Sequence, residues 1–107
     1  MSNCKIAILY VTKDDFIKEA AKTMLKQKDF DGSKYKNASC FVLDDSQTTK
    51  YKEEIDRFAK ENNCKVIRRG SVGPRMKCGN INFFIKNFGK NYDFYVILDS
   101  DTYIEEN

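Results

Sequence analysis

The feature that most restricts how this sequence can fold is a repeated alternation of apolar, strand-like runs with helix-like segments. Runs rich in β-branched or aromatic residues occupy 4–11, 39–43, 64–69 and 92–98. Apolar residues recur at helical spacing in three intervening segments, which are Ile17 to Leu25, 49–62 and Ile81 to Phe88. Nearly continuous apolar strands joined by helices indicate a parallel sheet covered by helices. Because crossovers between parallel strands are right-handed, we predict an α/β fold with a Rossmann-like, doubly wound, mostly parallel sheet and strand order 3-2-1-4.

Length and composition exclude several classes of protein. A chain of 107 residues is expected to form a single domain over 1–107. The sequence contains no histidine, which excludes Ser-His-Asp catalysis, Cys-His catalysis and imidazole metal sites. The net charge of +3 is small and spread along the chain, so no nucleic-acid partner is expected. No apolar stretch reaches the ~18–20 residues needed to cross a bilayer, and 1–5 does not open a signal peptide. We therefore expect a cytoplasmic location, with membrane association left open only for a longer parent protein.

The four cysteines do not form a metal-binding pattern, because they lie far apart and include no C-x-x-C pair. Cys4, Cys40 and Cys64 begin or lie within apolar runs, where a free cysteine behaves as a small core residue. We predict that these three are reduced and structural.

Every predicted strand ends in polar residues or is followed by them. They are Thr12 and Asp14, then Asp44 and Asp45, then Arg68 and Arg69, and finally Asp99 and Asp101. In open α/β sheets, ligands bind outside the carboxyl ends of the strands. The sequence therefore predicts a ligand site along that edge of the sheet.

The Asp99-x-Asp101 pair points to a divalent cation as one part of this ligand. Residues two apart on an extended chain project to the same side, so both carboxylates can converge on one ion. Mg²⁺ or Mn²⁺ held by one or two carboxylates usually completes its shell with water and phosphate oxygens. The glycine patterns G-x-G-x-x-G and G-x-x-x-x-G-K-[ST] are both missing, so a phosphate would have to be bound by other means.

The segment "RRGSVGPRMKCGNINFFIKNFGKNYDFYVILDSD" resembles the core of family 2 glycosyltransferases with the GT-A fold. Their pattern is a basic loop, K-A-G-N-[IL]-N, a helix, Tyr-Asp, an apolar strand and D-A-D or D-S-D. The earlier "VLDDS" resembles the acidic turn after the second strand of these enzymes. The resemblance runs from Ile6 to Asp101. Among these enzymes, the sequence is most similar to the cellulose synthase and periplasmic glucan glucosyltransferase group.

This resemblance implies a site for a nucleotide sugar, expected to be a UDP-sugar, together with Mg²⁺ or Mn²⁺. Thr12 and Asp14 correspond to the loop that meets the base, and Asp45, with Asp44 beside it, to the acidic contact with uracil. Lys77 corresponds to the lysine near the diphosphate, and Asn80 to the neighbouring asparagine of the nucleotide-sugar site. Asp99 corresponds to a residue that contacts both the ribose and the metal ion. Asp101 corresponds to a residue that binds the metal ion.

Each of these residues also has a structural interpretation. Thr12 or Asp14 can cap the first helix, and Asp44 and Asp45 can be turn or cap residues before the helix at 49–62. Lys77 can be a solvated lysine at a helix start, and Asn80 a capping residue in a first helical turn.

The resemblance also implies that such enzymes continue beyond the D-x-D strand. Their catalytic base and their binding residues for a glycan or lipid-linked acceptor come after that strand, so the present chain is expected to be the donor-binding half of a hexosyltransferase and inactive alone. As an edge strand, 92–98 is expected either to pair with a second copy or to be covered by a terminal segment. A non-catalytic nucleotide-binding or regulatory module and an unrelated receiver-like α/β domain remain as alternatives.

Overall fold

The computed structural model describes residues 5–29, 38–69 and 76–102, without the side chains of 26–29 and 76–78. The chain forms four strands, three α-helices and one 3₁₀ turn within these ranges. In chain order they are β1 (Ile6–Thr12), α1 (Lys18–Asp29), β2 (Ala38–Asp44), α2 (Thr49–Asn62), β3 (Lys65–Ile67), α3 (Met76–Phe88), η1 (Gly89–Asn91) and β4 (Phe94–Asp99).

The strands form one parallel sheet in the order β3-β2-β1-β4, which confirms the predicted fold class and strand order. β1 lies between β2 and β4, and its last residue, Thr12, is in register with Asp44 of β2. On the other side of β1, Val11 is in register with Asp99 of β4. The chain leaves β1 toward β2 and later returns to the opposite side of β1 as β4. The carboxyl ends of β1 and β4 therefore flank the topological switch point, where ligands of such sheets bind.

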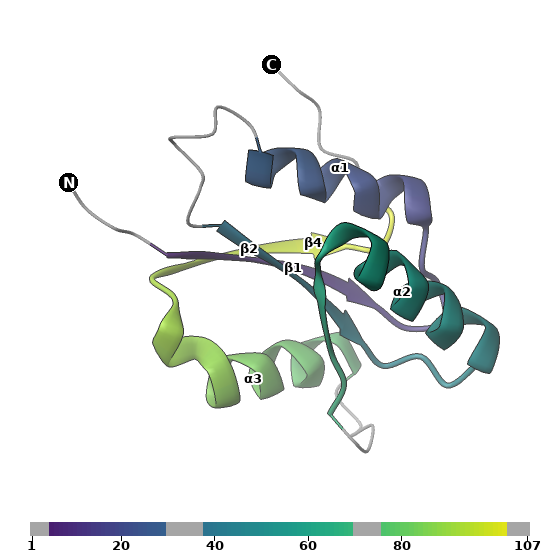
Figure 1. Cartoon of the computed structure of the whole chain (residues 1–107). Coiled ribbons are helices and arrows are strands. Elements are labelled where there is room, and N and C mark those ends of the chain that lie inside the picture. Colours follow the sequence, from purple (N-terminus) through teal and green to yellow (C-terminus); the bar gives the residue numbers. More distant parts are fainter. Residues whose placement is uncertain (1–4, 30–37, 70–75, 103–107) are drawn as a thin grey trace.

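The helices form a layer on each face of the sheet (Figure 1). α1 and α2 cover one face, where Met24, Ile55 and Phe58 pack against Tyr10 and Val42. α3 covers the other face through Phe84, whose ring centroid lies 4.9 Å from that of Phe41. This arrangement explains why β1 and β2 are apolar at consecutive positions, since both faces of these strands are buried.

The end of α3 is as the sequence predicts, because Gly89 follows the last helical residue, Phe88. A side chain at this position would place its Cβ 2.8 Å from the hydroxyl of Tyr95. That hydroxyl donates a hydrogen bond to the Gly89 carbonyl at 2.8 Å. The turn thereby joins α3 to the start of β4.

Several boundaries differ from the sequence prediction, and two of the differences bear on the site. α1 begins only at Lys18, so neither Thr12, the last residue of β1, nor Asp14 caps it. β3 is three residues long, because Arg68 and Arg69 leave the ladder and bind carboxylates on β2 and its loop.

The packing predicted for the cysteines can be followed at two positions. Cys40 is buried in the core, and Cys64 is half-buried and packs against it, as expected of structural cysteines. Cys4 and the side chain of Cys78 lie outside the described part of the chain. Among the helices described, none is long and apolar enough to cross a membrane.

Candidate functional site

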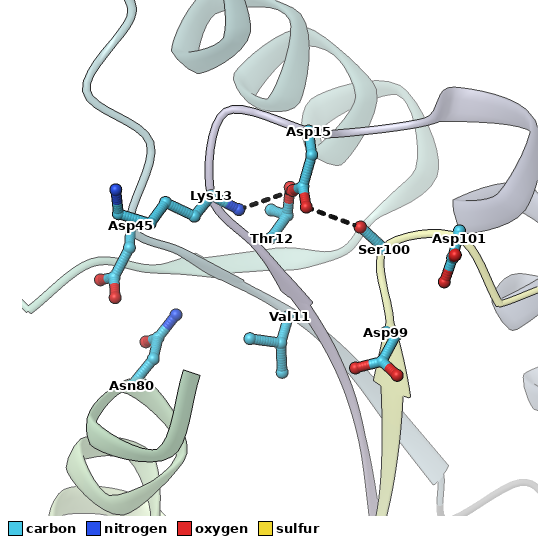
Figure 2. Close-up of a pocket in the computed structure, with 9 residues that line it drawn as sticks. All are labelled: Val11, Thr12, Lys13, Asp15, Asp45, Asn80, Asp99, Ser100 and Asp101. Atoms are coloured by element: carbon cyan, nitrogen blue, oxygen red, sulfur yellow. Dashed lines mark hydrogen bonds between the residues drawn. The ribbon is translucent and has the colours of Figure 1, made fainter. Parts of the chain in front are cut away.

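A cavity of about 440 Å³ opens at the carboxyl ends of β1, β2 and β4. All of the residues that line it, except Val11, carry polar side chains, as Figure 2 shows. The residues come from the end of β1 and the loop after it, the turn after β2, the start of α3 and the turn after β4. The lining residues are Val11, Thr12, Lys13, Asp15, Asp45, Asn80, Asp99, Ser100 and Asp101. Five residues singled out from the sequence therefore lie around one cavity, namely Thr12, Asp45, Asn80, Asp99 and Asp101.

A bidentate ion pair with Arg69 holds the Asp45 carboxylate in place. The Arg69 guanidinium donates from Nε to Oδ1 at 3.0 Å and from Nη2 to Oδ2 at 2.7 Å. Both side chains are nearly covered, at 9% exposure for Arg69 and 1% for Asp45. An ionised carboxylate offers about four lone-pair positions, so acceptor capacity remains on Asp45 after Arg69 is bound.

Asn80 lies beside Asp45 at the same end of the cavity (Figure 2). The residue is 1% exposed, and its amide Nδ2 donates to the carbonyl of Leu43 at 2.9 Å. That bond fixes the amide orientation and leaves Oδ1 as a buried acceptor for which the described residues provide no donor. An unpaired buried acceptor is costly, so the structure has an unmet need for a hydrogen-bond donor beside the cavity.

The opposite end of the cavity is formed by the turn after β4. Asp99 is the last residue of the strand, and its backbone N–H donates to the Thr102 hydroxyl at 3.1 Å. The Thr102 N–H returns a bond to the Asp99 carbonyl at 3.0 Å, which closes the turn. Asp99 and Asp101 are both exposed, and both line the cavity.

Two predicted site residues do not line the cavity. Asp14, in a left-handed conformation with φ of 54°, turns its carboxylate toward the start of α2. There it accepts hydrogen bonds from the N–H groups of Gln47 and Thr48, both at 2.9 Å. Asp44 accepts from the Ser46 N–H at 2.8 Å and from Arg68 Nε at 2.8 Å. In this structure both carboxylates organise loops beside the cavity.

The environment of Asp14 also sets its charge. The N–H group of Thr48, assisted by that of Gln47, stabilises the carboxylate and holds the pKa of Asp14 below its ordinary value of 3.8. The hydrogen bonds from Gln47 and Thr48 to the ionised Asp14 carboxylate therefore contribute their full stability above pH 3.8. That contribution is lost as the pH falls through the lowered pKa of Asp14.

Lys77 belongs to the first turn of α3, but its side chain lies outside the described part of the chain. The sequence prediction did not include Asp15 and Ser100, which line the cavity and are hydrogen-bonded to each other. The signal available for both was their position: Asp15 follows Asp14 after β1, and Ser100 is the middle residue of D-x-D.

The chemistry of Asp99 and Asp101 fits a hard divalent cation only if another molecule supplies further oxygens. Where side chains are described, no group of three or more aspartate, glutamate or cysteine residues is arranged to hold an ion. Two exposed carboxylates at the rim match the way Mg²⁺ and Mn²⁺ are shared between a protein and a substrate phosphate.

Comparison with known proteins identifies a family and a solved structure of similar fold among several that match. The model of the family described as "Glycosyl transferase family 2" matches residues 6–107. The crystal structure of S. aureus TarS has a similar fold, with a TM-score of 0.65 and 23% sequence identity. The match covers 96% of this chain and 18% of the TarS chain, so the present chain spans less than a fifth of that protein. No curated protein matches the sequence.

Proposed function

Because the chain belongs to glycosyl transferase family 2, we propose that its cavity binds the nucleotide part of a sugar donor, specifically a UDP-sugar. The reaction served would be transfer of a hexose to a glycan or a lipid-linked acceptor. The observation that carries the proposal is the division of the cavity into two chemically distinct ends. Asp45 and Asn80 lie at one end, and Asp99 and Asp101 lie at the other.

The end with Asp45 and Asn80 suits a uracil base. The buried Oδ1 of Asn80 is an acceptor with no donor among the described residues, and the Asp45 carboxylate adds further acceptor capacity. Uracil carries a donor, N3–H, on its pairing edge. Cytosine presents an acceptor at the same position, so it would place like partial charges against these oxygens. The cavity is therefore expected to prefer a uridine nucleotide to a cytidine nucleotide.

The end with Asp99 and Asp101 suits a metal-bound diphosphate. Both carboxylates are exposed at the rim, where a cation could join them to phosphate oxygens. A bound Mg²⁺ or Mn²⁺ would neutralise the negative charge that gathers on a departing diphosphate. The chain itself holds these two carboxylates in place, and Asp45 and Asn80 orient the base at the other end of the cavity.

UDP is expected to bind more tightly than CDP by roughly tenfold, or about 1.4 kcal/mol. The reason is the donor that uracil N3–H supplies to the acceptor-lined end of the cavity. The measurement is a titration with UDP, CDP and uridine in the presence of Mn²⁺, followed by amide chemical shifts. Equal affinity for UDP and CDP would contradict the assignment of the base to Asp45 and Asn80. Shifts confined to residues outside the cavity would contradict the site itself.

We also propose that isolated chains pair through β4. This strand is bonded only to β1 in the described sheet, and large apolar side chains on both of its faces are exposed. Phe94, Val96 and Ile97 are 58%, 42% and 47% exposed. Two copies related by a two-fold axis would pair their β4 strands antiparallel and cover these side chains together.

Sedimentation velocity over a concentration series tests this pairing. The parent chain is expected to associate, and Val96→Lys is expected to remain monomeric because an edge lysine opposes strand addition. Ile85→Lys makes the same apolar-to-lysine change on α3, where Ile85 is 41% exposed, and should associate as the parent does. A parent chain that stays monomeric at millimolar concentration would refute the pairing.

A further inference from the structure

We propose that Asp15 is a positioning residue: through Ser100 it braces the acidic turn 99–102, and so sets how Asp99 and Asp101 face the cavity. This inference rests on the proposed function for its consequence in metal-assisted UDP binding. The brace itself is a structural property that can be measured without any ligand.

The carboxylate of Asp15 joins two loops that are far apart in the sequence. Its Oδ1 accepts from the Thr12 hydroxyl and from the Lys13 N–H, both at 2.7 Å, within the β1–α1 loop. Its Oδ2 accepts from the Ser100 hydroxyl at 2.8 Å, across the cavity rim. Figure 2 shows Asp15 between these two groups of donors. Hydrogen bonds to an ionised acceptor are stronger than neutral ones, which suits a brace at an exposed rim.

Ser100 is held a second time through its backbone. The phenol of Tyr10, fully buried beneath the loop, donates to the Ser100 carbonyl at 2.6 Å. The phenol oxygen also accepts from the Ile17 N–H at 3.2 Å, which links this contact to the approach of α1. Ser100 is therefore fixed at both its carbonyl and its hydroxyl. The backbone on either side of Ser100 is thereby constrained, and with it the directions in which the side chains of Asp99 and Asp101 project.

The neighbouring Asp14 shows why Asp15 can face β4. The left-handed backbone at Asp14 turns the two consecutive carboxylates to opposite sides of the loop. Asp14 binds the start of α2 through Gln47 and Thr48, whereas Asp15 binds the turn after β4 through Ser100. The β1–α1 loop is thus tied to the connection on each side of it.

Positioning explains Asp15 better than metal binding does. The described carboxylates do not gather into a group of three that could hold an ion, so Asp15 does not join Asp99 and Asp101 as a ligand. Both of its oxygens also already accept hydrogen bonds, Oδ1 from Thr12 in its own loop and Oδ2 from Ser100. Its effect on a bound cation would therefore act through the turn that carries Asp99 and Asp101.

The test compares Ser100→Ala, Asp15→Ala and the double variant with the parent chain. Ser100→Ala removes only the bridging hydroxyl, and Ser39→Ala on β2 is its matched control. Asp93→Ala is the control for Asp15→Ala, because Asp93 accepts a bond from the Lys5 N–H at 2.8 Å near the first residues of β1 and β4. Two quantities are measured. One is the amide order parameters of residues 99–102 without ligand, and the other is the ratio of UDP affinity in Mn²⁺ to that in EDTA.

Both single variants are expected to lower the order parameters of 99–102 from about 0.85 toward 0.6 or below. The affinity ratio should fall by roughly fivefold, the effect expected from losing one net hydrogen bond. Uridine affinity should stay unchanged in Ser100→Ala, because this variant keeps the bonds of Asp15 to Thr12 and Lys13. The order parameters of 99–102 in the double variant should be no lower than those in Asp15→Ala, because both changes break the same hydrogen bond. The two controls should match the parent.

Unchanged order parameters in Ser100→Ala, or losses that simply add in the double variant, would overturn the brace. If the parent itself does not bind UDP, the proposed function fails, but the order parameters still decide whether Asp15 holds the turn. If the parent binds UDP with a metal-dependent gain that both variants retain, the proposed function stands and the inference about Asp15 is wrong.

Discussion

Asp45→Ala is expected to lower the free energy of unfolding by about 3–5 kcal/mol, a large part of the stability of a domain of this size. The reason is that Arg69, only 9% exposed, would lose the carboxylate to which its Nε and Nη2 groups donate. Removing one partner of a buried ion pair costs far more than removing one partner of an exposed pair. Urea denaturation followed by circular dichroism measures the change directly.

The chain contains a matched control for this variant. Arg68 bonds to Asp56 at 2.9 Å, but the Asp56 side chain is 57% exposed and the Arg68 side chain 33%. Asp56→Ala removes an ion pair of the same type from a solvated surface, so we expect a loss of about 1 kcal/mol or less. Similar losses for Asp45→Ala and Asp56→Ala would show that burial does not strengthen the Asp45–Arg69 pair.

Asp45→Ala should also weaken ligand binding at the base end of the cavity. Affinity for uridine and for UDP should fall by the same factor, because the base is common to both ligands. The titration is carried out at a temperature where the variant is fully folded, so that the loss of stability does not enter the affinity. A variant that loses UDP affinity but keeps uridine affinity would place the diphosphate, not the base, at Asp45.

Asp101→Asn is expected to abolish the gain in UDP affinity that Mn²⁺ or Mg²⁺ provides, a gain of roughly tenfold or more in the parent chain. The substitution keeps the size of the side chain and removes the negative charge that a hard cation needs. Isothermal titration with UDP in Mn²⁺ and in EDTA gives the ratio for parent and variant. Uridine should bind both proteins equally, because it has no diphosphate for the metal to join.

Asp93→Asn is the control for Asp101→Asn, since it neutralises an exposed aspartate just before β4 begins, at the end of the strand away from the cavity. It should keep the full effect of metal on UDP affinity. A parent chain whose UDP affinity is the same in EDTA as in Mn²⁺ would refute the metal role assigned to Asp99 and Asp101. Loss of uridine binding in Asp101→Asn would instead show that this residue helps to form the base end.

The order of the strands could be predicted because it follows from local pattern and handedness. Apolar strands separated by amphipathic helices, such as 49–62, leave few topologies once each crossover must be right-handed. The same reasoning placed polar residues of successive strands at one edge of the sheet. The structure accordingly has Thr12, Asp45 and Asp99 around a single cavity. The family resemblance from Ile6 to Asp101, carried by K-x-G-N and D-x-D, is borne out by the family match over 6–107.

The direction of each side chain was decided by contacts that no local pattern contains. Asp14 and Asp15 are adjacent and chemically identical, yet one binds the start of α2 and the other binds Ser100 after β4. Asp44 and Asp45 are likewise adjacent, and only Asp45 lines the cavity.

β3 ends at Ile67 because Arg68 and Arg69 reach across to these two carboxylates, an interaction between residues 24 positions apart. The amino-acid sequence was sufficient to predict that the polar residues at the strand ends gather at one edge of the sheet, since strand order follows from apolar pattern and crossover handedness. Which of these groups face the ligand, and which hold the loops, depends on the folded chain. The hydrogen bonds that orient each carboxylate come from elements distant in the sequence, and the cost of leaving a buried acceptor or charge unpaired selects one direction for each.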